Sequence, residues 1–172
     1  VLSPCPEDPA ASVAHHHICT AFDDEKGLAK LAELSDVVTY ELEQLPADTL
    51  RWLAARVPVA PSVRILEVAQ DRVREKTFLS SIGIPTAAWR TVERKDDLLK
   101  VLADIGRPAV FKVAYGGYDG KGQAMLEKTT MDSEVLAVWD RFANGAEMTA
   151  IIEEKLDFES ELSVIVGRSA DG

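Results

Sequence analysis

Long apolar runs are missing from this sequence. A membrane-spanning helix needs roughly 18 or more consecutive apolar residues, and no stretch of the chain approaches that length. The first residues, VLSPCPEDPA, also lack the basic-then-apolar order of a secretory signal peptide. We therefore predict a cytoplasmic protein with no membrane partner.

Basic residues are few relative to acidic ones. The chain has 19 lysines and arginines against 29 aspartates and glutamates, which gives a net charge of -10. Such a chain repels a nucleic-acid backbone, and no stripe rich in arginine and aromatic residues offsets the repulsion. We expect no nucleic-acid partner, although a few local lysines and a bound metal can still attract a small anion into a cleft.

Metal-ligating patterns are equally sparse. Cys5 and Cys19 match no zinc or redox spacing, so we expect reduced thiols. His15, His16 and His17 are adjacent, but successive residues of a strand point to opposite faces, so at most two could converge on an ion. We predict no native metal site at these histidines.

The chain does contain ample material for a core, since 47% of its 172 residues are hydrophobic. In the first third, helical spacing over residues 24–34 and 46–56 alternates with strand-like segments around Ile18 and over residues 36–40. This alternation predicts half of a parallel α/β sheet.

The pattern changes at the segment SIGIPT, where Gly83 and Pro85 end a helical stretch over residues 62–82. Beyond it, the periodicity predicts helices over residues 96–105 and 132–142. It also predicts five strands, over residues 87–92, 108–114, 123–127, 149–153 and 161–167. We expect this half to be a small α+β unit.

A lysine and a cluster of glycines stand out in this half. In AVFKVAYGGYDGKGQAML, residues 109–126, Lys112 lies within an apolar strand and four glycines fall within seven residues. Alternation puts Phe111 on one face of the strand and Lys112 on the other. Lys112 either reaches solvent at a sheet edge or meets an anion. The glycines favour the anion, because flexible backbone amides and Lys121 could close over phosphates.

Four segments of the chain carry a family resemblance: DVVTYELEQLP, AQDRVREKTFLSSIGIPTA, FKVAYGGYDGKGQ and IIEEKLDFESELSVIVGRSADG. Together they resemble the 5-(carboxyamino)imidazole ribonucleotide synthases, which are ATP-grasp enzymes of purine biosynthesis. The resemblance implies part of a Rossmann-like pre-ATP-grasp sheet domain, then the ATP-grasp lid subdomain and the start of the ATP-grasp core. It also implies a carbon-nitrogen ligase that uses ATP and bicarbonate to carboxylate the exocyclic amine of aminoimidazole ribonucleotide.

The resemblance further implies a set of ATP contacts. The strand lysine and the arginine of the DR pair would bind the phosphates, and a loop over residues 117–123 would close over them. The backbone of residues 153–156 would contact the adenine edge, and Glu161 would accept hydrogen bonds from the ribose. The full set is Arg72, Lys112, Gly117, Tyr118, Asp119, Gly120, Lys121, Gly122, Gln123, Glu153, Glu154, Lys155, Leu156 and Glu161.

From the residues alone, these positions have simpler interpretations. Arg72 could form a helix-surface ion pair with Asp71 or Glu75. The glycine-rich loop could be an ordinary long hairpin. Residues 153–156 and Glu161 could carry solvated charges at the ends of strands.

For the second substrate, the resemblance points to Glu41, Tyr118, Asp119 and Lys121. Asp119 with Glu41 would orient the substrate amine and imidazole ring, while Lys121 would contact anionic oxygen. Asp119 and Lys121 are therefore the predicted catalytic residues.

Compared with that family, the chain is expected to be an internal fragment that is inactive by itself. A glycine-rich turn would precede Val1, and the Mg2+ ligands would follow Gly172; phosphoryl transfer depends on that cation. The complete enzyme would be a homodimer. Two other interpretations stay open: a different ATP-grasp carboxylate-amine ligase of purine metabolism, and a non-catalytic nucleotide-binding module.

The resemblance and the change of pattern at SIGIPT together suggest a division of the chain into four parts. Residues 1–61 would form the partial N-terminal domain and residues 62–85 a helical junction. Residues 86–154 would form the lid subdomain with the glycine-rich loop, and residues 155–172 the start of the core.

Overall fold

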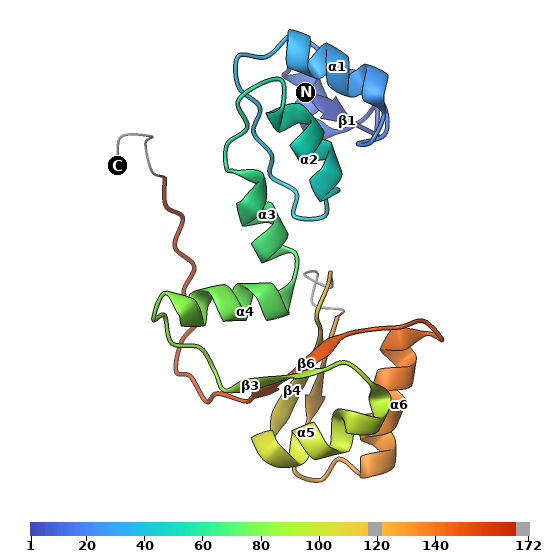
Figure 1. The fold of residues 1–172 in the computed structure, drawn as a ribbon, viewed down its shortest axis with the longest axis vertical. Coiled ribbons are helices and arrows are strands. Elements are labelled where there is room, and N and C mark those ends of the chain that lie inside the picture. The colour runs from blue at the N-terminus through green and yellow to red at the C-terminus, as the bar shows by residue number, and fades with distance from the viewer. Residues whose placement is uncertain (117–121, 168–172) are drawn as a thin grey trace.

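The computed structural model of the protein describes residues 1–116 and 122–167. Two units lie at opposite ends of the molecule, and the helices α3 (Val63–Ala69) and α4 (Arg72–Ser81) connect them (Figure 1). Each unit has its own cluster of buried hydrophobic side chains. The chain therefore combines an α/β part with an α+β part, as the sequence predicted.

The N-terminal unit is built on parallel pairing. Strands β1 (Leu2–Ser3) and β2 (Ile18–Cys19) pair in parallel, and the short 3-10 helix η1 (Pro9–Ser12) lies between them in sequence. Helices α1 (Glu25–Glu33) and α2 (Ala47–Ala54) follow. The core of this unit consists of Leu28, Val38, Leu45, Leu50, Leu53, Val57 and Leu66.

The strand predicted over residues 36–40 is reduced to a single bridge between Val38 and Val59. The amide of Val38 donates to Pro58 O at 2.8 Å, and Val38 O accepts from the amide of Ala60 at 2.9 Å. Pro58 has no N–H group to donate to this segment, so the ladder cannot extend past the bridge on that side.

The single helix predicted over residues 62–82 is two helices, α3 and α4, and they meet at Asp71. Asp71 has extended backbone angles (φ -129°, ψ 112°), and its carboxylate Oδ1 accepts the amides of Val73 at 2.8 Å and Arg74 at 3.2 Å. An aspartate that caps the first turn in this way starts a new helix. Helical periodicity continues across the break, so the periodicity of the sequence alone does not reveal it.

The C-terminal unit is a four-stranded antiparallel sheet in the order β3-β6-β4-β5. Its strands are β3 (Trp89–Val92), β4 (Ala109–Val113), β5 (Gln123–Leu126) and β6 (Ala150–Glu154). Its helices are α5 (Leu98–Ile105), which follows the 3-10 turn η2 (Lys95–Asp97), and α6 (Asp132–Ala143). These bounds agree with the predicted elements to within a few residues.

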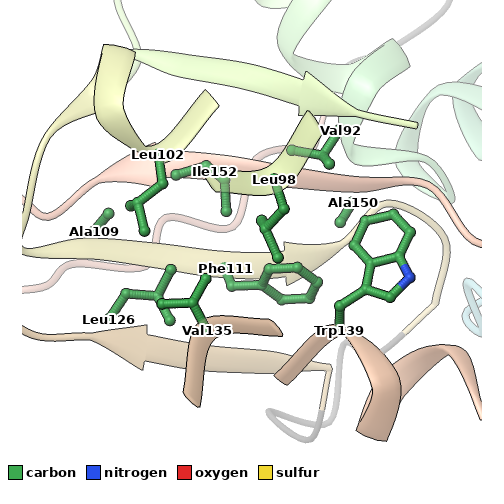
Figure 2. Close-up of a cluster of buried hydrophobic side chains, with 10 residues drawn as sticks. All are labelled: Val92, Leu98, Leu102, Ala109, Phe111, Leu126, Val135, Trp139, Ala150 and Ile152. Atoms are coloured by element: carbon green, nitrogen blue, oxygen red, sulfur yellow. The ribbon is translucent and has the colours of Figure 1, made fainter. Parts of the chain in front are cut away.

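Side chains of α5 and α6 pack on one face of this sheet. The buried cluster consists of Val92, Leu98, Leu102, Ala109, Phe111, Leu126, Val135, Trp139, Ala150 and Ile152 (Figure 2). Phe111 of β4 lies within it, with its ring edge-on to Trp139 at 6.2 Å and stacked on Phe142 at 5.6 Å. The residues of β4 that alternate with Phe111 must face the other side of the sheet, where α4 lies.

The strand predicted over residues 161–167 is not formed. These residues have no strand pairing within the described part of the chain, and their apolar side chains are open to solvent, with Ile165 99% exposed. An extended segment becomes a strand only when a neighbour supplies hydrogen-bond partners. Among the described residues this segment has no such neighbour.

Replacing Phe111 by alanine is expected to lower the free energy of unfolding by about 3–5 kcal/mol, because the change leaves a cavity beneath α5 and α6. Thermal or denaturant unfolding of the purified variant measures the loss. Phe158→Ala is the matched control, since Phe158 is 67% exposed, and it should change stability by less than about 0.5 kcal/mol. Equal losses in the two variants would contradict the assigned core.

Candidate functional site

The sheet face opposite the core carries a partly buried ion-pair cluster. Lys112 on β4 donates from Nζ to Glu153 Oε2 on β6 at 2.8 Å. In the register of these antiparallel strands Lys112 stands opposite Ile151, so Glu153 is its diagonal neighbour on the same face. Long side chains reach across such diagonals.

A second lysine completes this cluster. Lys76 Nζ on α4 lies 3.0 Å from the other carboxylate oxygen, Oε1 of Glu153. That contact is an ion pair without hydrogen-bond geometry, and the buried Oε1 has no hydrogen-bond donor among the described residues. Glu153 is 8% exposed, Lys76 13% and Lys112 25%. Two cations share one carboxylate, so the cluster carries an excess positive charge on an otherwise acidic chain.

Arg72 lies at the end of β4, where the glycine-rich segment begins. Its Nη1 donates to Val113 O at 2.8 Å and to Gly116 O at 2.5 Å, and its backbone amide donates to Ala114 O at 2.8 Å. The N-terminus of α4 is therefore hydrogen-bonded to the end of β4 and to the residues that follow it. Arg72 thus contacts the residue that follows Lys112. The two residues that the resemblance assigned to one site therefore lie near each other, at the corner where α4 begins and β4 ends.

A small hollow lies beside this corner. Its volume is about 300 Å3, and it is lined by Asp71, Val113, Ala114, Tyr115, Glu147, Met148 and Thr149. Asp71 and Tyr115, which both line the hollow, are joined by a β-bridge. The hollow thus borders both the start of α4 and the residues that lead into the glycine-rich segment.

The junction of α3 and α4 also contacts residues 41–45, which are called the upstream acidic segment here. The buried amide of Gln70 donates from Nε2 to Glu43 O and to Leu45 O, each at 2.6 Å. Glu41 in that segment is exposed and makes no ion pair with another described residue. The neighbouring Tyr40 donates to Ser62 O at 3.2 Å, and its burial raises the pKa of the phenol above its ordinary value.

The segment predicted to contact adenine, residues 153–156, is called the hinge here; it begins within β6 and continues beyond it. The amide of Glu154 donates to Ala88 O at 2.8 Å, and that of Lys155 donates to Pro108 O at 3.4 Å. Sheet bonds therefore hold the start of the hinge, while Leu156 beyond them is exposed. Glu161 is exposed as well and makes no ion pair with the other described residues.

Only the end of the predicted phosphate loop is described. Gly122 O accepts from the amide of Val113 at 2.9 Å, and Gln123 stands opposite Lys112 in the ladder between β4 and β5. The remaining loop positions, Gly117, Tyr118, Asp119, Gly120 and Lys121, lie outside the described residues.

Two residues of this region received no role from the sequence. Lys76 follows Arg72 by four residues in DRVREK, a spacing that places both on one side of a helix, and this was the available signal. Gln70 gave no such signal, because only the folded chain brings its amide to the carbonyls of Glu43 and Leu45.

Within residues 1–116 and 122–167, no three or more histidine, cysteine, aspartate or glutamate side chains come together as a metal site. His17 instead shares a hydrogen bond with Ser3 Oγ at 2.9 Å. In the same residues, every helix is too short or too polar to cross a bilayer.

Comparison with known proteins assigns both units. The profile of the ribonucleotide synthetase preATP-grasp domain matches residues 1–70, and that of the ATP-grasp domain matches residues 77–172. The N-terminal unit is therefore a pre-ATP-grasp domain, and the antiparallel sheet with its helices belongs to an ATP-grasp domain.

Individual relatives agree with these profiles. N5-carboxyaminoimidazole ribonucleotide synthase of Brucella melitensis is 41% identical over 172 residues, which are 100% of this chain and 46% of the relative. The enzyme of the same name from Bacillus subtilis is 34% identical over 172 residues, or 44% of its length. The chain thus spans a little under half the length of the curated relatives it matches.

A solved structure supports the same relationship. The ADP complex of an N5-carboxyaminoimidazole ribonucleotide synthetase matches with a TM-score of 0.81 and 35% sequence identity, covering 92% of this chain and 40% of that one. The ATP-grasp profile covers more than half of the chain, and a glycine-rich segment follows the lysine-bearing strand β4. The chain belongs to the ATP-grasp family.

Proposed function

We propose that this chain contributes to an ATP-grasp carbon-nitrogen ligase that carboxylates aminoimidazole ribonucleotide with ATP and bicarbonate in purine biosynthesis. The observation that carries the proposal is the lysine of β4, Lys112, which faces away from the core in a cluster of excess positive charge directly before the glycine-rich segment. The names of the relatives supply the substrate.

The proposed reaction has two steps. An oxygen of bicarbonate attacks the γ-phosphorus of ATP, and the bond to ADP breaks to give carboxyphosphate. The exocyclic amine of aminoimidazole ribonucleotide then attacks the carboxyl carbon, phosphate leaves, and the amine loses a proton. The protein must neutralise the triphosphate and bring the amine to the activated carboxyl group.

For the nucleotide, Lys112 and Arg72 are the proposed phosphate contacts. The side chain of Lys112 is a quarter exposed, which leaves it accessible to an anion. Arg72 is fastened to the carbonyls that lead into the glycine-rich segment, so its role would combine phosphate binding with support of that segment. Residues 117–123 would cover the phosphates from the other side.

For adenine and ribose, the proposed contacts are residues 153–156 and Glu161. The amides of Glu154 and Lys155 already bond within the sheet. The backbone around Leu156 is therefore the best candidate to meet the adenine edge. Glu161 is proposed to accept hydrogen bonds from the ribose hydroxyls.

For the second substrate, Glu41, Tyr118, Asp119 and Lys121 are the proposed contacts, with Asp119 and Lys121 acting in catalysis. Asp119 would orient the attacking amine, and Lys121 would contact the anionic oxygen of the activated carboxyl group. The hydrogen bonds from Gln70 to Glu43 and Leu45 support this proposal, because they tie the segment of Glu41 to the start of α4.

Magnesium, the homodimer and the cytoplasmic location are further parts of the proposal. The Mg2+ ligands are proposed to follow Gly172, as the resemblance to the synthase family implies. Mg2+ would neutralise phosphate charge. The division at residues 61, 85 and 154 is likewise kept as a proposal.

The protein at its natural length should release phosphate from ATP only when bicarbonate and aminoimidazole ribonucleotide are both present. A coupled phosphate assay with each substrate omitted in turn measures this dependence. Stimulation by a different purine intermediate would favour another carboxylate-amine ligase. Nucleotide binding without turnover on any of these substrates would favour a non-catalytic module.

Lys112→Ala in the same protein should weaken ATP binding by about 1.5–3 kcal/mol, because it removes a charge-assisted contact. Titration calorimetry with a non-hydrolysable ATP analogue measures the change. Lys100→Ala is the control, since Lys100 is exposed on α5, across the sheet from the cluster. Unchanged affinity in a folded Lys112→Ala variant would remove this lysine from the site.

A further inference from the structure

The ion-pair cluster has an unusual composition for a partly buried site. Charged groups taken out of water are costly unless they are well paired, and a single carboxylate here faces two ammonium groups. The three groups come from α4, β4 and β6, which are separated widely in sequence. A buried ion pair is weak evidence for stability, which points to a role beyond holding the fold together.

The two lysines are not equivalent. Lys112 makes a true hydrogen bond to Oε2 at 2.8 Å and keeps a quarter of its side chain exposed. Lys76 approaches Oε1 at 3.0 Å without hydrogen-bond geometry, and its side chain is only 13% exposed. Lys112 can therefore meet a ligand, whereas Lys76 is directed to the buried oxygen of Glu153.

We infer that Lys76 is a positioning residue that acts through Glu153 on Lys112. Its contact with Oε1 fixes the orientation of the Glu153 carboxylate, so that Oε2 can hold the Lys112 ammonium where the phosphates arrive. It also offsets the attraction of Glu153 for Lys112, which leaves the Lys112 charge available to an anion. This inference rests on the proposed nucleotide-binding function and extends it to a residue on the connecting helix.

The position of Lys76 on α4 adds a structural consequence. Arg72, one turn earlier on the same helix, is bonded to the exit of β4 through Val113 O and Gly116 O. Lys76 fixes the same helix to β6. Helix α4 therefore contacts both the exit of β4 and the Glu153 carboxylate that holds Lys112. A substitution at Lys76 should consequently change the affinity for nucleotide.

The test is a double-mutant cycle on the protein at its natural length, with affinity for a non-hydrolysable ATP analogue measured by calorimetry. Lys76→Met should raise Kd about five- to tenfold, whereas Lys76→Arg, which keeps the positive charge, should retain most of the wild-type affinity. If Lys76 acts through Glu153, adding Lys76→Met to Glu153→Gln should change Kd by less than about twofold. Arg74→Met is the matched control, because Arg74 lies on the same helix with 63% of its side chain exposed, and it should leave Kd unchanged.

Each other outcome overturns the inference in a distinct way. Independent, additive effects of Lys76→Met and Glu153→Gln would mean that Lys76 does not act through Glu153. If Lys76→Met leaves Kd unchanged while Lys112→Ala still weakens nucleotide binding, Lys76 has no positioning role and the proposed function stands. A wild-type protein that binds no nucleotide would overturn the proposed function and the inference together. Thermal unfolding checks that each variant is folded, and Lys76→Gln replaces Lys76→Met, with the same expected effect, if the latter does not fold.

Discussion

The alternation of side chains along β4 is the constraint on which both the core and the candidate site depend. Phe111 is fully buried beneath α5 and α6, so its neighbour Lys112 must project from the opposite face of the sheet. The antiparallel register with β6 then places Glu153 on that same face. A shift of one residue in this register would bury the lysine in the core and expose the phenylalanine. Hydrophobic packing on one face therefore fixes the electrostatics of the other.

The start of α4 joins the two units through side-chain hydrogen bonds to backbone carbonyls. Gln70 bonds to carbonyls of the N-terminal unit, and Arg72 bonds to carbonyls at the exit of β4. Asp71 between them caps α4 and bridges to Tyr115. Three successive residues thus connect the upstream acidic segment to the glycine-rich segment. In the proposed enzyme these are the segments that would bind the two substrates.

Much of the fold was predictable because it depends on short-range patterns. Alternation identified the strand with Phe111 and Lys112, and glycines and prolines identified the ends of helices. The errors share one physical cause, which is that pairing and capping are decided by neighbours. Residues 36–40 form only one bridge because Pro58 opposite them has no N–H group, and residues 62–82 divide because Asp71 caps a new helix. Residues 161–167 have no neighbouring strand among the described residues.

The sequence by itself determined the family, the lysine of β4 and the glycine-rich segment that follows it, because these features lie close together along the chain. The tertiary structure decided what surrounds that lysine. Lys76, Lys112 and Glu153 are 36 and 41 residues apart in sequence, and their meeting follows from how α4 and β6 pack around β4. Periodicity assigns a residue to a face of its own helix or strand. Which charges meet across two such faces is decided only when the elements pack together and exclude water.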